Sequence, residues 1–184
     1  MILAVDPGLS KCGWAVVEPR TAAIAELGLI VSERDSTLDT STDRARRIDR
    51  QAEILLELVR RHGCDRIAAE GVTLGGPVHV KLAMATGLYL SWGVLTGIAR
   101  CLGIGLYEVM PKVWQHAVQP GRKKIHYDSL ESAMQEHVGP QVGAQLLAIA
   151  SSNRNHALDA CGIGMLAALR PHEATRIIAR RVVA

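Results

Sequence analysis

Apolar residues near the start of the chain form two short runs without helical spacing. The runs are Ile2–Val5 and Gly13–Val17, and between them Pro7 and Gly8 predict a turn. We therefore expect a hairpin of neighbouring strands, with Asp6 at the end of the first. A carboxylate there is costly to desolvate, so it needs hydrogen bonds, a cation or a metal. For Asp-Pro-Gly taken alone, the simpler interpretation is that Asp6 begins a turn.

Further along, the pattern alternates between helical and strand periodicities. Apolar residues from Ile48 to Val59 recur at three- and four-residue steps, which predicts a helix capped by Ser41 or Thr42 and ended by Gly63. Further strands are expected at Ile24–Ser32, with a bulge or bend at Gly28, at Asp65–Glu70 and at Gly103–Val109; further helices are expected at Val78–Leu102, Val113–Ala117, His126–His137, Gly139–Ala150 and Asn155–Leu169. This order predicts an α/β fold, a mixed five-stranded sheet flanked by helices.

Acidic residues recur where these elements end or begin. A strand, a helix and a strand in succession imply parallel pairing, so Asp6 and Glu70 should lie at the same edge of the sheet. His156 and Asp159 are three residues apart in the last helix and share one face of it. Two acids at one sheet edge are poorly explained by structure alone, and we prefer a shared metal or catalytic site.

Composition fits one domain, residues 1–170, followed by a basic C-terminal tail, residues 171–184. The net charge of +3 is too small to indicate a nucleic-acid partner by itself. Its distribution is more informative, because Val109–His126 holds four basic residues and no acid. A solvated basic loop is the alternative there, and for the arginines between Arg44 and Arg50 we prefer a solvated helix face.

Cysteine usage and apolar runs bear on location. The four cysteines are dispersed and form no C-x-x-C pair, which favours reduced thiols in the cytoplasm. We expect no signal peptide, because the leading apolar run ends at Asp6. Leu82–Ala99 has eighteen residues without a charge, but it contains several Gly, Ser and Thr residues. We expect a helix buried in a core or in an oligomer interface, not a membrane span.

The motifs resemble those of a known family. Asp6-Pro7-Gly8 with its following strand, the strand ending in Glu70, and the helix beginning His156-Ala157-Leu158-Asp159 are similar to the RuvC Holliday-junction endonucleases of the RNase H-like superfamily. The resemblance extends from Met1 to about Leu169. It implies an RNase H-like fold and a structure-selective endonuclease that resolves four-way (Holliday) DNA junctions by paired symmetric cuts, in DNA recombination and repair.

The resemblance also implies a catalytic metal site of Asp6, Glu70, His156 and Asp159, holding two Mg²⁺ or Mn²⁺ ions. Asp6 would bridge the ions, Glu70 and Asp159 would each hold one, and His156 would complete a shell or assist proton transfer. Hard divalent cations favour such oxygen ligands. Position 156 is Asp in many relatives, and because imidazole is a softer ligand we expect Mn²⁺ to support activity better than Mg²⁺. A helix-start histidine bonded to backbone is the structural alternative for His156.

A second departure from the family lies three residues after Glu70. Relatives usually carry an aromatic residue there that stacks on a junction base, whereas this chain has Thr73. A stacking contact worth about 1–3 kcal/mol per base is therefore missing. The missing contact should weaken the preference for a four-way junction over other branched DNA.

The resemblance implies further partners. Pro111–Lys124 is similar to the family's DNA-contacting stretch, and the candidate DNA-binding residues are Thr73, Lys81, Lys112, Arg122, Lys123 and Lys124. The Leu82–Ala99 helix is similar to one that relatives use for dimerisation, which implies a homodimer. A branch-migration helicase fits the family but has no signature in the sequence. Trp92 and Trp114 are expected to pack in the core.

Three alternative functions remain open. The first is a nuclease of the same fold that acts on single-stranded, flap or other branched DNA. The second is an actin-like kinase or ATPase lobe, since Asp-x-Gly after a first strand also begins that phosphate-binding hairpin. The third is a junction-binding protein without catalytic activity.

Overall fold

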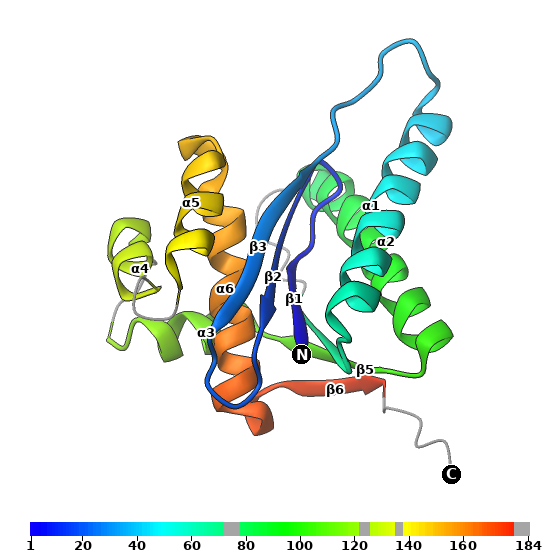
Figure 1. Ribbon diagram of the computed structural model, residues 1–184. Helices are drawn as coiled ribbons and strands as arrows, with labels where there is room; N and C mark the ends of the chain where they lie inside the picture. The colour runs from blue at the N-terminus through cyan, green and yellow to red at the C-terminus, as the bar shows by residue number, and fades with distance from the viewer. Residues whose placement is uncertain (72–77, 122–125, 135–137, 179–184) are drawn as a thin grey trace.

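The computed structural model has three layers, with a sheet between two groups of helices (Figure 1). It describes residues 1–71, 78–121, 126–134 and 138–178, and of residues 78–84, 129 and 133 the backbone alone. The strands are β1 (Ile2–Asp6), β2 (Lys11–Val17), β3 (Ile24–Val31), β4 (Arg66–Glu70), β5 (Gly105–Val109) and β6 (Thr175–Ile178). The helices are α1 (Thr40–His62), α2 (Val78–Leu102), α3 (Pro111–Val118), α4 (Tyr127–Met134), α5 (Pro140–Ala148) and α6 (Arg154–Leu169), with short 3₁₀ turns at Ser151–Asn153 and Pro171–Glu173.

The strands lie in the order β3-β2-β1-β4-β5-β6. β1 pairs antiparallel with β2 and parallel with β4, and β4 pairs parallel with β5. The register sets Val5 opposite Ala69, so Asp6 and Glu70, the last residues of β1 and β4, end side by side at one edge. The α/β class and the mixed sheet predicted from the sequence are confirmed.

The sheet has six strands, so the predicted count of five is wrong. β6, in the segment expected to be a basic tail, pairs antiparallel with β5. Three of its four residues are exposed and only Ile178 is buried, as expected of an edge strand. Because this strand is short and carries Arg176, its apolar pattern is too weak to stand out from the surrounding arginines.

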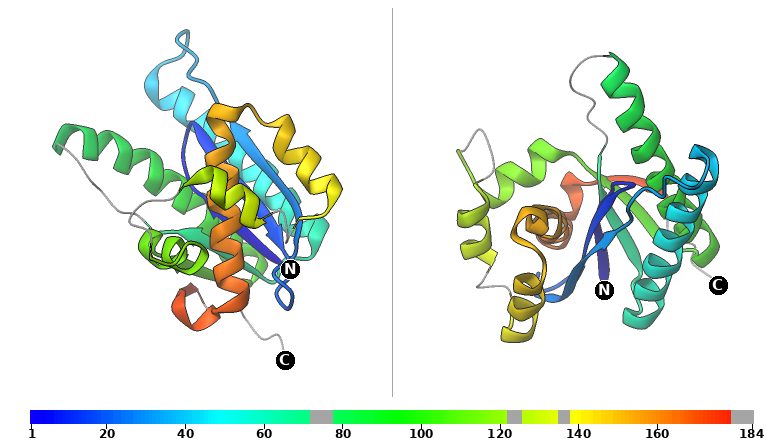
Figure 2. Two further views of the ribbon diagram at one scale, coloured as in Figure 1. Left: turned by 90° about the vertical axis from the view of Figure 1, so that its left-hand side faces the viewer. Right: turned by 90° about the horizontal axis from the view of Figure 1, so that it is seen from above.

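β1 is buried on both faces, and its side chains divide the core in two. Leu3 and Val5 belong to the core under α1 and α2, whereas Ile2 and Ala4 belong to the core under α3 to α6. Figure 2 shows α6 lying along one face of the sheet with α1 and α2 on the other. The continuous apolar run at Ile2–Val5 is therefore the signature of a central strand.

Gly28 in β3 makes room for an aromatic ring and does not form a bulge. A Cβ there would lie 2.4 Å from the ring of Trp14 on β2. The irregularity between these strands falls at Val16/Val17 of β2. The expectation of a bulge or bend at Gly28 is therefore wrong. Glycine is needed there because the ring of Trp14 packs closely against the backbone.

α1 begins two or three residues earlier than predicted. Its N-cap is Asp39, not Ser41 or Thr42, and the Asp39 carboxylate accepts hydrogen bonds from the backbone N–H groups of both of those residues. A carboxylate at this place also complements the positive end of the helix dipole. The helix ends at Gly63 in the left-handed conformation, as predicted.

The expected solvated arginine face of α1 is correct only in part. Arg47 is buried, with a side chain 8% exposed, and it pairs with Asp43. The sequence pattern could not show this because the other partners of Arg47, Ser10 and Ser32, come from distant parts of the chain. Arg44, Arg46 and Arg50 are exposed.

α6 is surrounded by protein. Every residue from Ala160 to Ala167 is buried, so burial is not confined to one face of this helix. The helix packs on β1 and β2 on one side and on α3 and α4 on another. Gly162 leaves room for the ring of Trp114, which is fully buried as predicted.

α2 occupies the segment without charges. Within the residues that the structure describes, no helix combines the length and the apolarity that crossing a bilayer requires. Val94, Leu95 and Ile98 pack into the core beside α1. Gly93 and Gly97 lie on the exposed side of the helix.

Candidate functional site

The four predicted site residues come from three elements that meet at one edge of the sheet. Asp6 ends β1, Glu70 ends β4, and His156 and Asp159 lie in the first turns of α6. The start of α6 reaches the sheet because Gly13 on β2 has no side chain. A Cβ on Gly13 would lie 2.0 Å from the carbonyl oxygen of His156, so only glycine permits this approach.

Each side chain of the site has a distinct hydrogen-bond partner. His156 Nδ1 lies 2.7 Å from Asp6 Oδ2. The indole of Trp114 donates to Glu70 Oε1 at 2.9 Å. The Tyr127 hydroxyl donates to Asp159 Oδ2 at 3.2 Å. His156 therefore bonds a carboxylate of the site, and not the backbone as in the structural alternative considered for it.

The carboxyl groups are close enough to repel one another. Burial raises the pKa of Asp6, an effect that the contact with His156 opposes. Burial and the charge of Asp6 raise the pKa of Glu70 to about 7. Burial and the charges of Asp6 and Glu70 raise the pKa of Asp159 to about 8. Raised pKa values mean that the ionised forms of these carboxyl groups are destabilised, and a bound cation would stabilise them.

One buried oxygen of this cluster has no hydrogen-bond partner among the described residues. Asp159 Oδ1 is buried and accepts no hydrogen bond from them, and the same is true of Oδ1 of nearby Asn155. A buried carboxylate oxygen without a donor is costly, so it fits a position meant for a ligand. In the present arrangement, no group of three or more His, Cys, Asp and Glu side chains among the described residues could hold a metal ion. The carboxylates are held by separate partners instead.

Sequence reasoning missed two residues that hold the site. Trp114 was expected only to pack in the core, yet it also fixes the Glu70 carboxylate. Tyr127, a third exposed at the start of α4, bonds Asp159 and was not singled out at all. Trp92 donates in addition to the Glu70 backbone carbonyl at 3.2 Å. The one available signal was the polar end of each aromatic ring, which needs a partner when buried.

The predicted DNA-contacting residues are described only in part. Lys112 is exposed in the first turn of α3, directly after β5. The backbone of Lys81 lies in α2, and its side chain is outside the described residues. Thr73, Arg122, Lys123 and Lys124 also lie outside the described residues.

Comparison with known proteins supports the resemblance. The family model described as crossover junction endodeoxyribonuclease RuvC matches residues 2–101. A crossover junction endodeoxyribonuclease RuvC from Parafrankia sp. (strain EAN1pec) is 32% identical over 109 residues, which cover 58% of this chain and 57% of that protein. The match thus spans little more than half the length of this curated relative.

Solved structures with a similar fold match almost the whole chain. Thermus thermophilus RuvC in complex with a Holliday junction substrate gives a TM-score of 0.70 at 17% identity, covering 96% of this chain and 98% of that one. The yeast mitochondrial Holliday junction resolvase Ydc2 gives a TM-score of 0.56 at 12% identity, covering 94% and 82%. The Fowlpox virus resolvase, solved with substrate Holliday junction DNA, gives 0.51 at 13% identity, covering 91% and 98%. These likenesses confirm the expected fold.

Proposed function

Because the chain belongs to the RuvC family of crossover junction endodeoxyribonucleases, we propose that it is a metal-dependent, structure-selective endonuclease that resolves four-way DNA junctions. The observation that carries the proposal is the group of Asp6, Glu70 and Asp159 at one sheet edge, where the charge of Asp6 raises the pKa values of both Glu70 and Asp159. Such a group suits hydrolysis of a phosphodiester only when cations offset its charge. The named structural relatives solved with junction DNA support the same substrate.

The donor atoms of the four site residues suit a pair of divalent cations, which would have to draw these side chains closer together than they lie in the present arrangement. Asp6, Glu70, His156 and Asp159 would hold Mg²⁺ or Mn²⁺, and the oxygen-rich donor set and the unpartnered Asp159 Oδ1 support this. When bound, such ions activate water and offset charge on the leaving oxygen. We expect Mn²⁺ to support activity better than Mg²⁺, because imidazole is a softer ligand than carboxylate.

The chain's own side chains prepare the site for this chemistry. Trp114 orients the Glu70 carboxylate through its indole N–H. Tyr127 holds one oxygen of Asp159 and leaves the other free of donors. The imidazole of His156, bonded to Asp6, can exchange a proton with that carboxylate.

We propose that DNA lies across this edge of the sheet. Lys112 would contact a phosphate beside the site, and Thr73, Lys81, Arg122, Lys123 and Lys124 remain candidate contacts from sequence. The exposed position of Lys112 directly after β5 supports the first of these.

We also propose a homodimer formed through α2, in a cytoplasmic protein. Tyr89 is 62% exposed on this helix, and Gly93 and Gly97 follow it at four-residue steps on the same exposed side. In the part of the chain that the structure describes, no atom lies within 4 Å of a Cβ built on either glycine, so a second helix can approach closely there. Two sites related by a two-fold axis would make paired cuts possible.

The proposal is tested by cleavage of a synthetic four-way junction with Mg²⁺ or Mn²⁺, with binding measured in parallel by fluorescence anisotropy. Wild type should cut two strands symmetrically, and Asp159→Asn should bind but not cut. Asp128→Asn, an exposed acid of α4, serves as the matched control and should cut normally. Preferred cutting of flap or single-stranded DNA would select the alternative substrate, whereas binding without cutting by wild type would contradict nuclease activity.

A further inference from the structure

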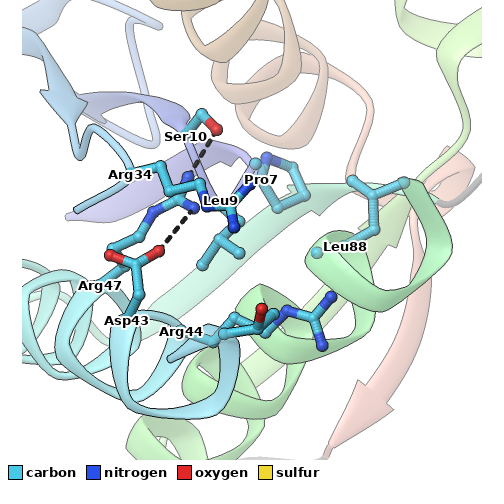
Figure 3. Close-up of a pocket in the computed structure, with 11 residues that line it drawn as sticks. Pro7, Leu9, Ser10, Arg34, Asp43, Arg44, Arg47 and Leu88 are labelled. Atoms are coloured by element: carbon cyan, nitrogen blue, oxygen red, sulfur yellow. Dashed lines mark hydrogen bonds and ion pairs between the residues drawn. The ribbon is translucent and has the colours of Figure 1, made fainter. Parts of the chain in front are cut away.

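A separate cavity lies beside the start of the site. Its volume is about 470 Å³, it is open to solvent, and it is bordered by the β1–β2 turn, the N-terminal part of α1 and the middle of α2. Figure 3 shows the residues that line it, among them Pro7 and Leu9 from the turn and Leu88 from α2. Pro7 follows Asp6 directly in the chain, so the cavity begins one residue from the candidate metal site.

The cavity carries a net positive charge. Three arginines line it, Arg34, Arg44 and Arg47, against a single acid, Asp43. Asp43 is already paired within the protein, because its carboxylate accepts hydrogen bonds from Arg46, from Arg47 and from the backbone N–H of residue 35. These contacts hold the pKa of Asp43 below its usual range, so the acid stays ionised and neutralised by its own helix.

Arg47 forms the fixed wall of the cavity. It donates to Ser10 Oγ at 2.5 Å and pairs with Asp43 at 3.5 Å (Figure 3). Arg34 and Arg44 are exposed and form no ion pair within the described part of the chain. Two cations without a partner at the rim of a cavity are available to an anion from outside the protein.

The arginine side chains, and not the helix terminus, supply this positive potential. Asp39 caps α1 and already accepts from the N–H groups of Ser41 and Thr42. The guanidinium groups that remain match the oxygens of a phosphate through paired donors. Leu9 and Leu88 add apolar surface beside them, which suits a phosphate attached to a sugar better than a free inorganic ion.

The turn that forms the floor of the cavity is held firmly. The carbonyl of Gly8 accepts from Gln51 Nε2 at 2.7 Å, and the carbonyl of Leu9 accepts from Ser32 Oγ at 2.6 Å. Ser91 of α2 donates to Gln51 Oε1 in turn. The cavity is therefore fixed relative to Asp6 by contacts from α1, from α2 and from Ser32, the residue after β3.

We propose that this cavity binds a backbone phosphate of the DNA strand that passes the acidic site, with Arg34 and Arg44 as its cationic ligands. The inference rests on the proposed function and adds a positioning contact to it. Because both arginines face solvent, they can meet a polyanion lying on the surface and release its counterions. Neither residue touches the reacting atoms, so they act on binding and placement of the strand.

The test compares two double variants that each remove two positive charges. Arg34→Gln/Arg44→Gln alters the cavity, and Arg20→Gln/Arg50→Gln alters exposed arginines that do not line it. Binding of a fluorescent four-way junction is measured in EDTA at salt concentrations from about 50 to about 200 mM. Over this range the loss of a phosphate contact changes both the affinity and its dependence on salt. The cavity variant should lose about tenfold or more in affinity at the middle of this range, and its salt slope should fall by about one. The control should change less than about twofold.

The outcomes separate this inference from the proposed function. Equal affinities for the two double variants, at unchanged thermal stability, would overturn the phosphate contact even if wild type cuts DNA. Tight binding of inorganic phosphate or a mononucleotide by wild type, with junction binding unaffected by Arg34→Gln/Arg44→Gln, would make the cavity a small-molecule site and overturn the proposal equally. Failure of wild type to cut would contradict nuclease activity, and the binding comparison would still decide the role of the cavity.

Discussion

Replacing Asp159 by asparagine should stabilise the metal-free protein at alkaline pH. The folded protein raises the pKa of this carboxyl from 3.8 to about 8, because the group is buried beside Asp6 and Glu70. Ionising it therefore costs free energy in the folded state and not in the unfolded one. The sign follows from linkage: between these two pKa values the folded state binds more protons, so the free energy of unfolding falls as pH rises. Asparagine keeps the shape and the acceptor for Tyr127 but carries no charge.

The size of the effect can be bounded. At about 1.4 kcal/mol per pKa unit, an isolated and fully buried carboxyl with this shift would cost about 6 kcal/mol at pH 8. Asp159 is only partly buried, and Asp6 and Glu70 readjust their own protonation when it ionises, so we expect about 2–4 kcal/mol. For a chain of this length, that corresponds to a rise in Tm of about 5–15 °C.

The assay is thermal unfolding in EDTA at about pH 5 and pH 8, values that fall inside the window set by the shifted pKa. Asp159→Asn should exceed wild type at pH 8 and much less at pH 5, while Asp128→Asn, on the exposed side of α4, should follow wild type at both. Adding Mn²⁺ should raise the Tm of wild type more than that of Asp159→Asn. A variant that is no more stable than wild type at pH 8, or equally stabilised at both pH values, would refute the electrostatic reasoning.

Three further changes test individual contacts of the site. Trp114→Phe keeps a buried ring but removes the indole N–H donor that lowers the pKa of Glu70. Cleavage at neutral pH should therefore fall about 10–100-fold, and the acidic limb of the pH–rate profile should move to higher pH. An unchanged profile would contradict this role of Trp114. Gly13→Ala would drive a Cβ to 2.0 Å from the His156 carbonyl oxygen and should lower Tm and activity together, whereas Gly143→Ala, which meets no atom, should be neutral or slightly stabilising in thermal unfolding. His156→Asp should shift the ratio of Mn²⁺- to Mg²⁺-supported cleavage toward Mg²⁺, and equal or better turnover of wild type with Mg²⁺ would argue against a soft ligand at this position.

The parts of the fold that could be predicted from sequence are those set by local patterns. The run Ile2–Val5 has no helical spacing and is followed by a turn at Pro7 and Gly8, and that is enough to indicate a strand with Asp6 at its end. The parallel pairing of β1 and β4 then follows from the intervening helix, which is why Asp6 and Glu70 could be assigned to one edge. The metal ligation of these residues stays a prediction.

The contacts that orient the site could not be predicted, because they join residues far apart in the chain. Trp114 and Glu70 are separated by 44 positions, and Tyr127 and Asp159 by 32. Periodicity identifies a buried ring but does not reveal where its polar atom points. The same reason hid the hydrogen bond that buried Arg47 donates to Ser10, which lies 37 positions away.

Edge elements were the other source of error. β6 has four residues and a single buried side chain, so nothing in its composition distinguishes it from a charged tail. It belongs to the sheet because β5 offers an unpaired edge, with Leu106 opposite Ile178. Such a strand is specified by its neighbour more than by its own sequence.

Two of the three tryptophans in the chain donate to the same residue, one to the backbone oxygen of Glu70 and one to its carboxylate. The protein thereby carries a built-in optical reporter, since the emission of an indole responds to charge in its immediate surroundings. Titrating a cation while following intrinsic fluorescence would then read out events at Glu70 without any label, and Trp114→Phe would identify which of the two rings supplies the signal.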